Sequence, residues 1–425
     1  MIGLLLLGSF LLLMLLRLPI AFALAIPAVT YILYAGFPVT MVAHRMTLAL
    51  DSFPLLAVPL FILVGSLMNQ SGMTTHIFRF ASDLVSHWRA GLAQVNILVS
   101  LIFSGTSGAA LADIGGVGQM EIRAMVERGY KRSFAAALTA ASATVGPIFP
   151  PSIPLIIYAA VAEVSALRVL IAGIVPALVT VVLLMVATGI LARFRQLPAS
   201  EGAPSLRQIF AHFASAFPAL LTPVVLISGM LLGVFSPTEA AAVTVGYILL
   251  ISVFIYRGLT FRGFIEASID TVRTTSSIMI VVAAAALFGW ALTVEQVPQA
   301  FATLLLSVST DLFVVLLIVN LLLIVAGMFL ETISALLIVT PIVLPPLVLL
   351  GADPVHIGVI IVFNLMIGLL TPPMGMSLFL VSSVAKAPLE RVLRELVPYF
   401  IPLLIMLLII TYVPAVSLWL PEATR

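Results

Sequence analysis

Small and oxygen-bearing residues interrupt an otherwise apolar stretch between residues 92 and 122. The interruption runs through Ser104, Gly105, Thr106, Ser107, Gly108, Ala109, Ala110, Leu111, Ala112 and Asp113. Hydroxyl and carbonyl oxygens suit a hard cation such as sodium, although small residues also let helices pack tightly without any ion. An aspartate in apolar surroundings indicates a function by default, and the alternative for Asp113 is a helix N-cap.

A proline-rich pattern occurs twice in the chain. Gly146-Pro147-Ile148-Phe149-Pro150-Pro151 corresponds to Gly368-Leu369-Leu370-Thr371-Pro372-Pro373, 222 residues later. At the same shift Gly105 matches Gly327, Leu167 matches Leu389 and Pro176 matches Pro398, while Asn96 and Asn320 match at a shift of 224. Because proline removes an amide donor and clashes with the preceding turn, each pattern predicts a broken helix. Duplicated halves with broken helices in hydrophobic sequence are typical of secondary transporters.

The broken helices predict two cation sites and an adjacent anion site. Unpaired backbone groups at membrane depth are tolerated only where protein, water, ions or substrate complete them. The first predicted sodium shell contains Ser104, Gly105, Thr106, Ser107, Gly146, Ile148 and Pro150, and the second contains Gly327, Gly368, Thr371 and Met374. Half-helix amino ends direct positive dipoles toward a carboxylate. The residues predicted to bind this substrate are Ser107, Gly108, Asp113, Pro151, Glu331, Thr332 and Pro373. For Glu331 two roles remain open, ion or proton coupling and hydrogen bonding of the hairpin tip.

Composition identifies the class of protein. Hydrophobic residues make up 62% of the 425 positions and charged residues only 8%. A soluble domain carries about 25% charged residues, so this chain is expected to be an integral membrane protein. The absence of cysteine excludes disulfides, thiolate metal sites and cysteine nucleophiles.

Apolar runs divide the chain into spans and hairpins. Ordinary spans are expected at 2–16, 20–36, 54–70, 168–192, 215–233, 238–256, 276–293 and 396–417. The stretches 92–122 and 312–350 are predicted to be re-entrant hairpins, while 134–163 and 356–386 are predicted to cross with a break at the Pro-Pro elements. No basic residue precedes the first apolar run and Arg17 follows it, which is the reverse of a secretory signal. We therefore expect a retained first helix with its N-terminus outside.

The distribution of basic residues supports this topology. With both hairpins re-entrant, all of the 19 Lys and Arg residues except Arg45, Arg168 and Arg425 fall inside. The positive-inside rule asks for this bias, and treating either hairpin as an ordinary span would remove it. The second half then has the opposite orientation to the first, as an inverted repeat requires.

The predicted organisation follows from these spans. Residues 1–192 form the first inverted repeat, with scaffold helices at 1–75, an arm at 76–90, a transport hairpin and broken helix at 91–163 and a scaffold helix at 164–192. Residues 193–208 form a cytoplasmic linker. Residues 209–425 form the second repeat, with scaffold helices at 209–257, an arm at 258–275, a transport hairpin and broken helix at 276–386 and a terminal helix at 387–425. The arm at His76–Trp88 is an amphipathic surface helix or a lever between domains, and we take Phe261–Arg273 as its repeat mate.

Other motifs give weaker signals. Ser236-Pro237-Thr238-Glu239 is best explained as a helix capping box. Gly105-Thr106-Ser107-Gly108 matches the nucleophile pattern of rhomboid proteases, but no histidine is expected at membrane depth, so an enzyme is not expected. A passive channel is the better rival, because duplicated halves also build channels. Helices broken at matched positions favour a carrier.

The full set of motifs resembles one family. Ser104 to Gly118, Gly146 to Pro154, Gly233 to Ala242 and Gly327 through Pro346 are similar to the large membrane subunit of tripartite ATP-independent periplasmic (TRAP) transporters. The resemblance covers essentially the whole chain and places sodium ligands at the two shells named above. It implies the fold of the ion transporter superfamily, with a scaffold and an elevator-like transport domain in a bacterial inner membrane.

The resemblance also implies partners and cargo. The partners would be a small four-helix membrane subunit and a soluble periplasmic protein that delivers the substrate. Sodium ions would drive import of a C4-dicarboxylate, a sialic acid or another organic acid, and no other cofactor is implied.

Overall fold

The protein is all-helical. The computed structural model describes residues 2–108, 110–195, 197–198 and 204–424, and of residues 104–107 it describes the backbone alone. All regular structure in these ranges is helix, which confirms the predicted all-α class. Eight segments among them are long and apolar enough to cross a membrane. Large apolar side chains such as Phe210, Phe254 and Leu304 lie exposed on the outside, as a lipid-facing surface requires.

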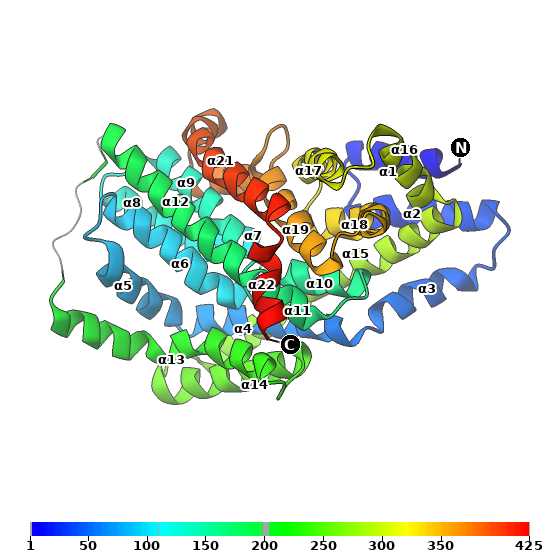
Figure 1. Ribbon diagram of the computed structural model, residues 1–425. Coiled ribbons are helices and arrows are strands. Elements are labelled where there is room, and N and C mark those ends of the chain that lie inside the picture. Colours follow the sequence, from blue (N-terminus) through cyan, green and yellow to red (C-terminus); the bar gives the residue numbers. More distant parts are fainter. Residues whose placement is uncertain (1, 109, 196, 199–203, 425) are drawn as a thin grey trace.

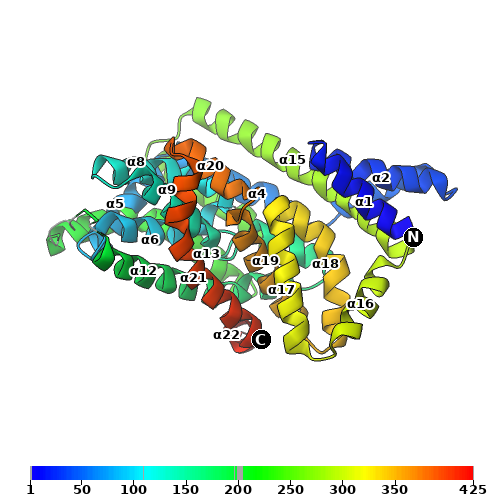
Figure 2. The same cartoon turned by 90° about the horizontal axis from the view of Figure 1, so that it is seen from above.

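One group of helices includes the long helix α15 (Phe261–Val294). The first half contributes α1 (Ile2–Leu15), α2 (Ile20–Tyr34), α3 (Thr40–Leu50), η1 (Phe53–Leu56), α4 (Ala57–Gln70) and α5 (Met73–Val85). The second half contributes α13 (Leu206–Leu231), α14 (Pro237–Leu250), the π-helical turn η3 (Ile251–Ile255) and α16 (Val297–Val308). Helix α15 contacts α2, α3 and α4, and it runs along one side of the molecule in Figure 2.

The second group contains two hairpins and two broken helices. The first half supplies α6 (Gly91–Ser107), α7 (Ala110–Gly115), α8 (Val117–Glu127), α9 (Arg132–Ser142), η2 (Ala143–Val145) and α10 (Ile153–Val161), followed by α11 (Ala166–Ala172) and α12 (Ile174–Phe194). The second half supplies α17 (Leu312–Phe329), α18 (Thr332–Leu349), α19 (Pro354–Leu370) and α20 (Met376–Ala385), followed by α21 (Leu389–Tyr412) and α22 (Ala415–Ala423). In Figure 1 these helices extend from α8 and α12 on the left to α17 and α18 right of the centre.

Both predicted helix breaks are present at equivalent positions. The first separates η2 from α10 and contains a cis peptide bond between Pro150 and Pro151. The second separates α19 from α20 and contains a cis bond between Pro372 and Pro373. The two repeats therefore share the hairpin and broken-helix architecture that their sequences predicted.

The structure corrects the predicted repeat mate of the first arm. Phe261–Arg273 is not a separate surface helix, because it continues without interruption into the apolar part of α15. The 222-residue shift places His76–Trp88 at positions 298–310, where α16 lies. Helices α5 and α16 therefore occupy equivalent positions in the two repeats, each immediately before a hairpin in the sequence. A helix of 34 residues joins a polar first half to an apolar second half because nothing between Arg273 and Ser276 breaks it.

The predicted capping box is confirmed. The Ser236 hydroxyl accepts a hydrogen bond from the Glu239 amide (3.3 Å), and a Glu239 carboxylate oxygen accepts from the Ser236 amide (2.8 Å). Glu239 thus fixes the start of α14 and is structural in this position.

Candidate functional site

The side chain of Ser152 forms hydrogen bonds with both sides of the first helix break. Its hydroxyl accepts a hydrogen bond from the Leu155 amide at 3.1 Å, which caps the start of α10. The same hydroxyl donates to the Pro147 carbonyl and so connects the two sides of the break. The Val145 carbonyl accepts from the amides of Ile148 and Phe149. Among the described residues no hydrogen-bond donor reaches the carbonyls of Gly146 and Pro150. These two predicted ligands therefore offer oxygen atoms to an ion.

Hairpin one packs directly on this break. Gly108 ends α6 with a φ of +59°, and a Cβ atom added there would lie 2.5 Å from the Pro151 carbonyl oxygen. On the other side of the hairpin tip, an Asp113 carboxylate oxygen occupies the space where a Cβ of Gly146 would be. Glycine is required at Gly108, where φ is positive and a backbone oxygen leaves no room, whereas a side chain at Gly146 would displace the Asp113 carboxylate.

The other residues of the first predicted sodium shell divide into two groups. Ser104, Gly105, Thr106 and Ser107 form the last turn of α6, close in sequence to Gly108, and their side chains lie outside the described residues. The Ile148 carbonyl lies against Gly173 at the junction of α11 and α12. Their assignment as sodium ligands stays a prediction.

The second predicted shell is brought together by a close contact between α17 and α19. A Cβ atom on Gly368 would lie 2.6 Å from the Gly327 Cα, so only glycine fits at this crossing. The Gly375 amide donates to the Met328 carbonyl at 3.2 Å, which ties the second break to hairpin two. The Thr371 hydroxyl donates to the Ile367 carbonyl at 2.8 Å, and its lone pairs remain for a cation. Met374 follows in the break with its side chain exposed.

A central cavity of about 180 Å³ lies where the two hairpin tips and the two breaks meet. The polar side chains that line it are Ser66, Asn69, Asp113, Thr274, Glu331 and Thr332. Three of the predicted substrate residues, Asp113, Glu331 and Thr332, thus share one cavity. Gly108 and Pro151 contact each other beside it, whereas Pro373 is exposed and does not line it. The cavity is the candidate substrate site.

The carboxylate of Glu331 caps the start of α18. One oxygen accepts hydrogen bonds from the amides of Ile333 (3.0 Å) and Ser334 (3.3 Å), as the hairpin-tip hypothesis expected. Asp113, by contrast, lies within the first turn of α7 and is not the residue that precedes it. Both carboxyl groups nevertheless line the cavity.

Three cavity residues come from helices that the sequence assigned to the scaffold and arm. Ser66 and Asn69 lie on α4, and Thr274 lies on α15. No local pattern in the sequence distinguishes these three residues from the other polar residues of their helices. A Cβ on Gly116 would lie 3.6 Å from the Asn69 amide nitrogen, which shows how closely α4 approaches hairpin one.

Asparagines at matched positions tie each hairpin to its broken helix. In the first repeat, the Asn96 carbonyl oxygen accepts from the Ser142 hydroxyl at 2.8 Å. In the second, the Asn320 carbonyl oxygen accepts from the Asn364 amide at 2.8 Å. Ser142 and Asn364 are 222 residues apart, so the same contact occurs in both repeats. All four residues are buried, and the repeat signal at Asn96 and Asn320 therefore marks a structural bond.

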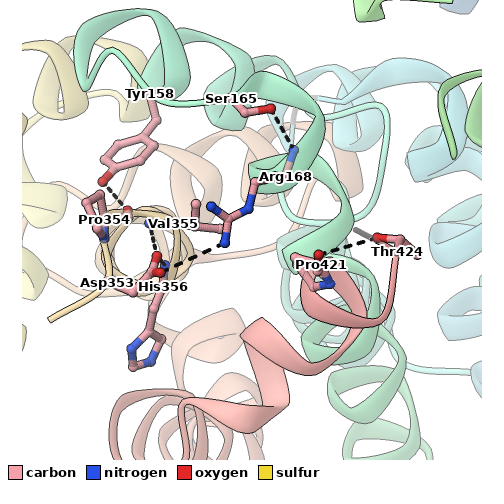
Figure 3. Close-up of polar contacts among 9 residues, drawn as sticks. All are labelled: Tyr158, Ser165, Arg168, Asp353, Pro354, Val355, His356, Pro421 and Thr424. Atoms are coloured by element: carbon pink, nitrogen blue, oxygen red, sulfur yellow. Dashed lines mark hydrogen bonds and ion pairs between the residues drawn. The ribbon is translucent and has the colours of Figure 1, made fainter. Parts of the chain in front are cut away.

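The two broken helices also contact each other (Figure 3). The Tyr158 hydroxyl of α10 donates to the Pro354 carbonyl at 2.5 Å, and the Tyr158 ring fills the space beside Gly358 on α19. Arg168 of α11 points toward Asp353, with its guanidinium 4.0 Å from the carboxylate. Asp353 in turn caps α19 through the Val355 amide at 2.7 Å. These contacts join the repeats into one unit around the cavity.

Comparison with known proteins identifies close relatives. Residues 7–416 match the family model described as the DctM component of the tripartite ATP-independent periplasmic transporters. The chain is 42% identical to the sialic acid TRAP transporter large permease protein SiaM of Vibrio cholerae, over 95% of each chain. It is 38% identical to the C4-dicarboxylate TRAP transporter large permease protein DctM of Pseudomonas aeruginosa, over 93% of this chain and 92% of that one.

A solved structure shares the fold. The YdaH transporter of Alcanivorax borkumensis superposes with a TM-score of 0.64 over 90% of this chain and 88% of that one. The sequence identity is only 14%, so the likeness concerns the arrangement of helices.

Proposed function

Because the chain belongs to the DctM family of tripartite ATP-independent periplasmic transporters, we propose that it is the large membrane subunit of a sodium-driven importer of an organic acid anion. The cargo is a C4-dicarboxylate, a sialic acid or a similar carboxylate, and the names of relatives include the first two of these together with the sulfonate isethionate. Members of this family transport solutes and are not enzymes.

The charge of the central cavity is the observation that carries this proposal. Its lining residues include the carboxyl groups of Asp113 and Glu331 and contain no Lys, Arg or His. An anion entering such a cavity would be repelled unless cations enter with it. Sodium ions at the two breaks would supply this positive charge, and the carbonyls of Gly146 and Pro150 and the hydroxyl of Thr371 have the chemistry to hold them.

The position of the cavity supports an elevator-type movement. One wall consists of hairpins and broken helices, and the opposite wall consists of α4 and α15. The mobile unit in this proposal contains both hairpins and both breaks, joined by Tyr158 and the asparagine contacts. It slides against α4 and α15 and exposes the cavity alternately on the two sides of the membrane.

The rest of the assembly follows from the tripartite family. A small four-helix membrane subunit would pack against the exposed apolar helices, and a periplasmic solute-binding protein would deliver the substrate. The complex would lie in a bacterial inner membrane with the N-terminus of this chain on the periplasmic side. The basic residues near 131 and 386–394 would then face the cytoplasm, as the positive-inside rule asks.

Uptake by the reconstituted complex tests the proposal. Proteoliposomes that contain both membrane subunits, supplied with the binding protein, are given radiolabelled succinate or N-acetylneuraminate. We expect accumulation of one of these probes above its external concentration only with an inward sodium gradient. Uptake that merely equilibrates, with or without sodium, would instead indicate a passive channel.

Substitution of Thr371 tests the second sodium shell. We expect Thr371→Ala to raise the sodium concentration for half-maximal uptake by about tenfold, the effect of losing roughly 1.4 kcal/mol of ion binding. Thr371→Ser keeps the hydroxyl and should restore most of the affinity. Equal sodium dependence of Thr371→Ala and the parent protein would remove Thr371 from the shell.

A further inference from the structure

A second, smaller cavity lies in the first repeat, behind one wall of the central cavity. It has a volume of about 10 Å³, and its polar lining consists of Ser100, Asp113, Glu121 and Thr139. Phe103, Asp113 and Val117 line both cavities, so the two adjoin. A space of this size admits one occupant about as large as a water molecule.

Glu121 on α8 presents an unused oxygen to this cavity. The residue is only 2% exposed, and its Oε2 atom accepts a hydrogen bond from the Asn96 amide at 2.8 Å. Its Oε1 atom is buried and has no hydrogen-bond partner among the described residues. A buried carboxyl oxygen without a partner is energetically costly, so this atom needs an occupant of the cavity.

On the described helices that pack against α8, no buried basic side chain compensates Glu121. Helices α6 and α7, which pack on α8, contain no Lys, Arg or His. The only basic residue of helix α9 is Arg132, which is exposed at the start of the helix. On α8 itself Arg123 is exposed, and α20, which also contacts α8, has no basic residue. A carboxyl group in such surroundings requires a cation from solution to stay ionised.

The neighbouring hydrogen bonds turn oxygen lone pairs toward the cavity. The Ser100 hydroxyl donates its proton to the Ser142 hydroxyl at 2.9 Å, which leaves its lone pairs for another partner. The Asn96 amide donates to both Glu121 and the Thr139 hydroxyl, at 2.8 Å each. The cavity therefore offers hydroxyl and carboxyl oxygens from four side chains, a ligand set that suits a hard cation.

The second repeat shows that an acid is not needed to build this region. The positions equivalent to Glu121 and Thr139 are Val343 and Ile361, and the hairpin is tied to its broken helix by neutral Asn320 and Asn364. The fold is thus made without a carboxyl group in one repeat and contains a buried one in the other. This asymmetry indicates a ligand that only the first repeat binds.

We propose that the cavity between Glu121 and Asp113 binds one sodium ion, additional to the ions at the two helix breaks. The ligands are Oε1 of Glu121, the Asp113 carboxylate and the hydroxyl oxygens of Ser100 and Thr139. The role of this ion in coupling rests on the proposed sodium-driven transport, whereas its binding can be measured without transport. Because Asp113 also borders the central cavity, the ion would fix the position of Asp113 beside the substrate.

Equilibrium binding of ²²Na⁺ to the purified full chain in lipid nanodiscs tests this site. We expect Glu121→Gln to bind one sodium ion fewer at saturation than the parent protein, since glutamine keeps the bond from Asn96 but loses the charge. Glu127→Gln, at the exposed end of the same helix, is the matched control and should bind the full number. Ser100→Ala should keep the number of ions and weaken their apparent affinity at least threefold.

Each result of this experiment is decisive. An unchanged number of ions in a folded Glu121→Gln protein would show that the cavity holds water, and the proposal would be wrong. If Glu121→Gln does not fold, the affinity of Ser100→Ala decides the question. Loss of one ion together with uptake that ignores the sodium gradient would keep the site and overturn the proposed sodium-driven function instead.

Discussion

Gly368→Ala is expected to abolish uptake and to destabilise the transport unit. The added methyl group would lie 2.6 Å from the Gly327 Cα, 2.7 Å from its carbonyl carbon and 2.8 Å from the Ile324 carbonyl oxygen. All three are backbone atoms, so α17 and α19 must separate to accept it. Overpacking of this kind costs about 1–3 kcal/mol, and the separation also moves the carbonyls of the second sodium shell. Thermal unfolding and sodium-dependent uptake measure the two effects.

Gly289→Ala provides the matched control for this prediction. Gly289 lies inside α15, and a Cβ atom there meets nothing within 4 Å. Because alanine favours helix by up to about 1 kcal/mol over glycine, this variant should be at least as stable as the parent and should transport normally. Normal uptake by Gly368→Ala would contradict the close contact of α17 with α19.

Glu331→Ala is expected to reduce substrate uptake more than tenfold. The substitution removes the cap from the amides of Ile333 and Ser334 at the tip of hairpin two, and it removes a side chain from the central cavity. Loss of a helix cap costs about 1 kcal/mol, and here the loosened turn forms the wall of the substrate site. Uptake at several substrate concentrations would show whether binding or turnover is affected.

Asp311→Ala is the control that distinguishes the loss of a helix cap from the loss of a side chain in the central cavity. Asp311 starts the first helix of the same hairpin and accepts a hydrogen bond from the Phe313 amide at 2.8 Å, but it is exposed and lies outside the cavity. It should lose a similar stability, about 1 kcal/mol, with little change in uptake. Equal loss of uptake in both variants would show that hairpin stability alone, and not the position of Glu331, limits transport.

The two repeats have similar backbone frameworks but differ in their buried and capping side chains. Both repeats use a tip packed against a Pro-Pro break and a buried asparagine contact. The first repeat contains the buried Glu121 at a position where the second has Val343, and the second has a carboxylate cap, Glu331, at its tip. The two repeats thus share their framework and differ in the side chains that line the cavities.

The sequence by itself determined the membrane class, the helical fold and the positions of both breaks. Composition excludes a polar surface, and proline at Pro151 and Pro373 removes amide donors wherever the chain folds. Composition is a total over the whole chain and the effect of proline is local, so neither depends on which distant segments pack together. The capping box at Ser236 was predictable for the same reason, because all its atoms lie within four residues.

Tertiary structure decided which polar residues meet. Ser66, Asn69 and Thr274 line the cavity because α4 and α15 pack against the hairpins, and no local pattern distinguishes them from other polar residues in apolar helices. Glu121 was missed because its isolation becomes visible only when the helices that pack on α8 are known, and the basic residues of α8 and α9, Arg123 and Arg132, are exposed. Contacts between distant segments have no signature in the spacing of residues along the chain, and a binding site consists of such contacts.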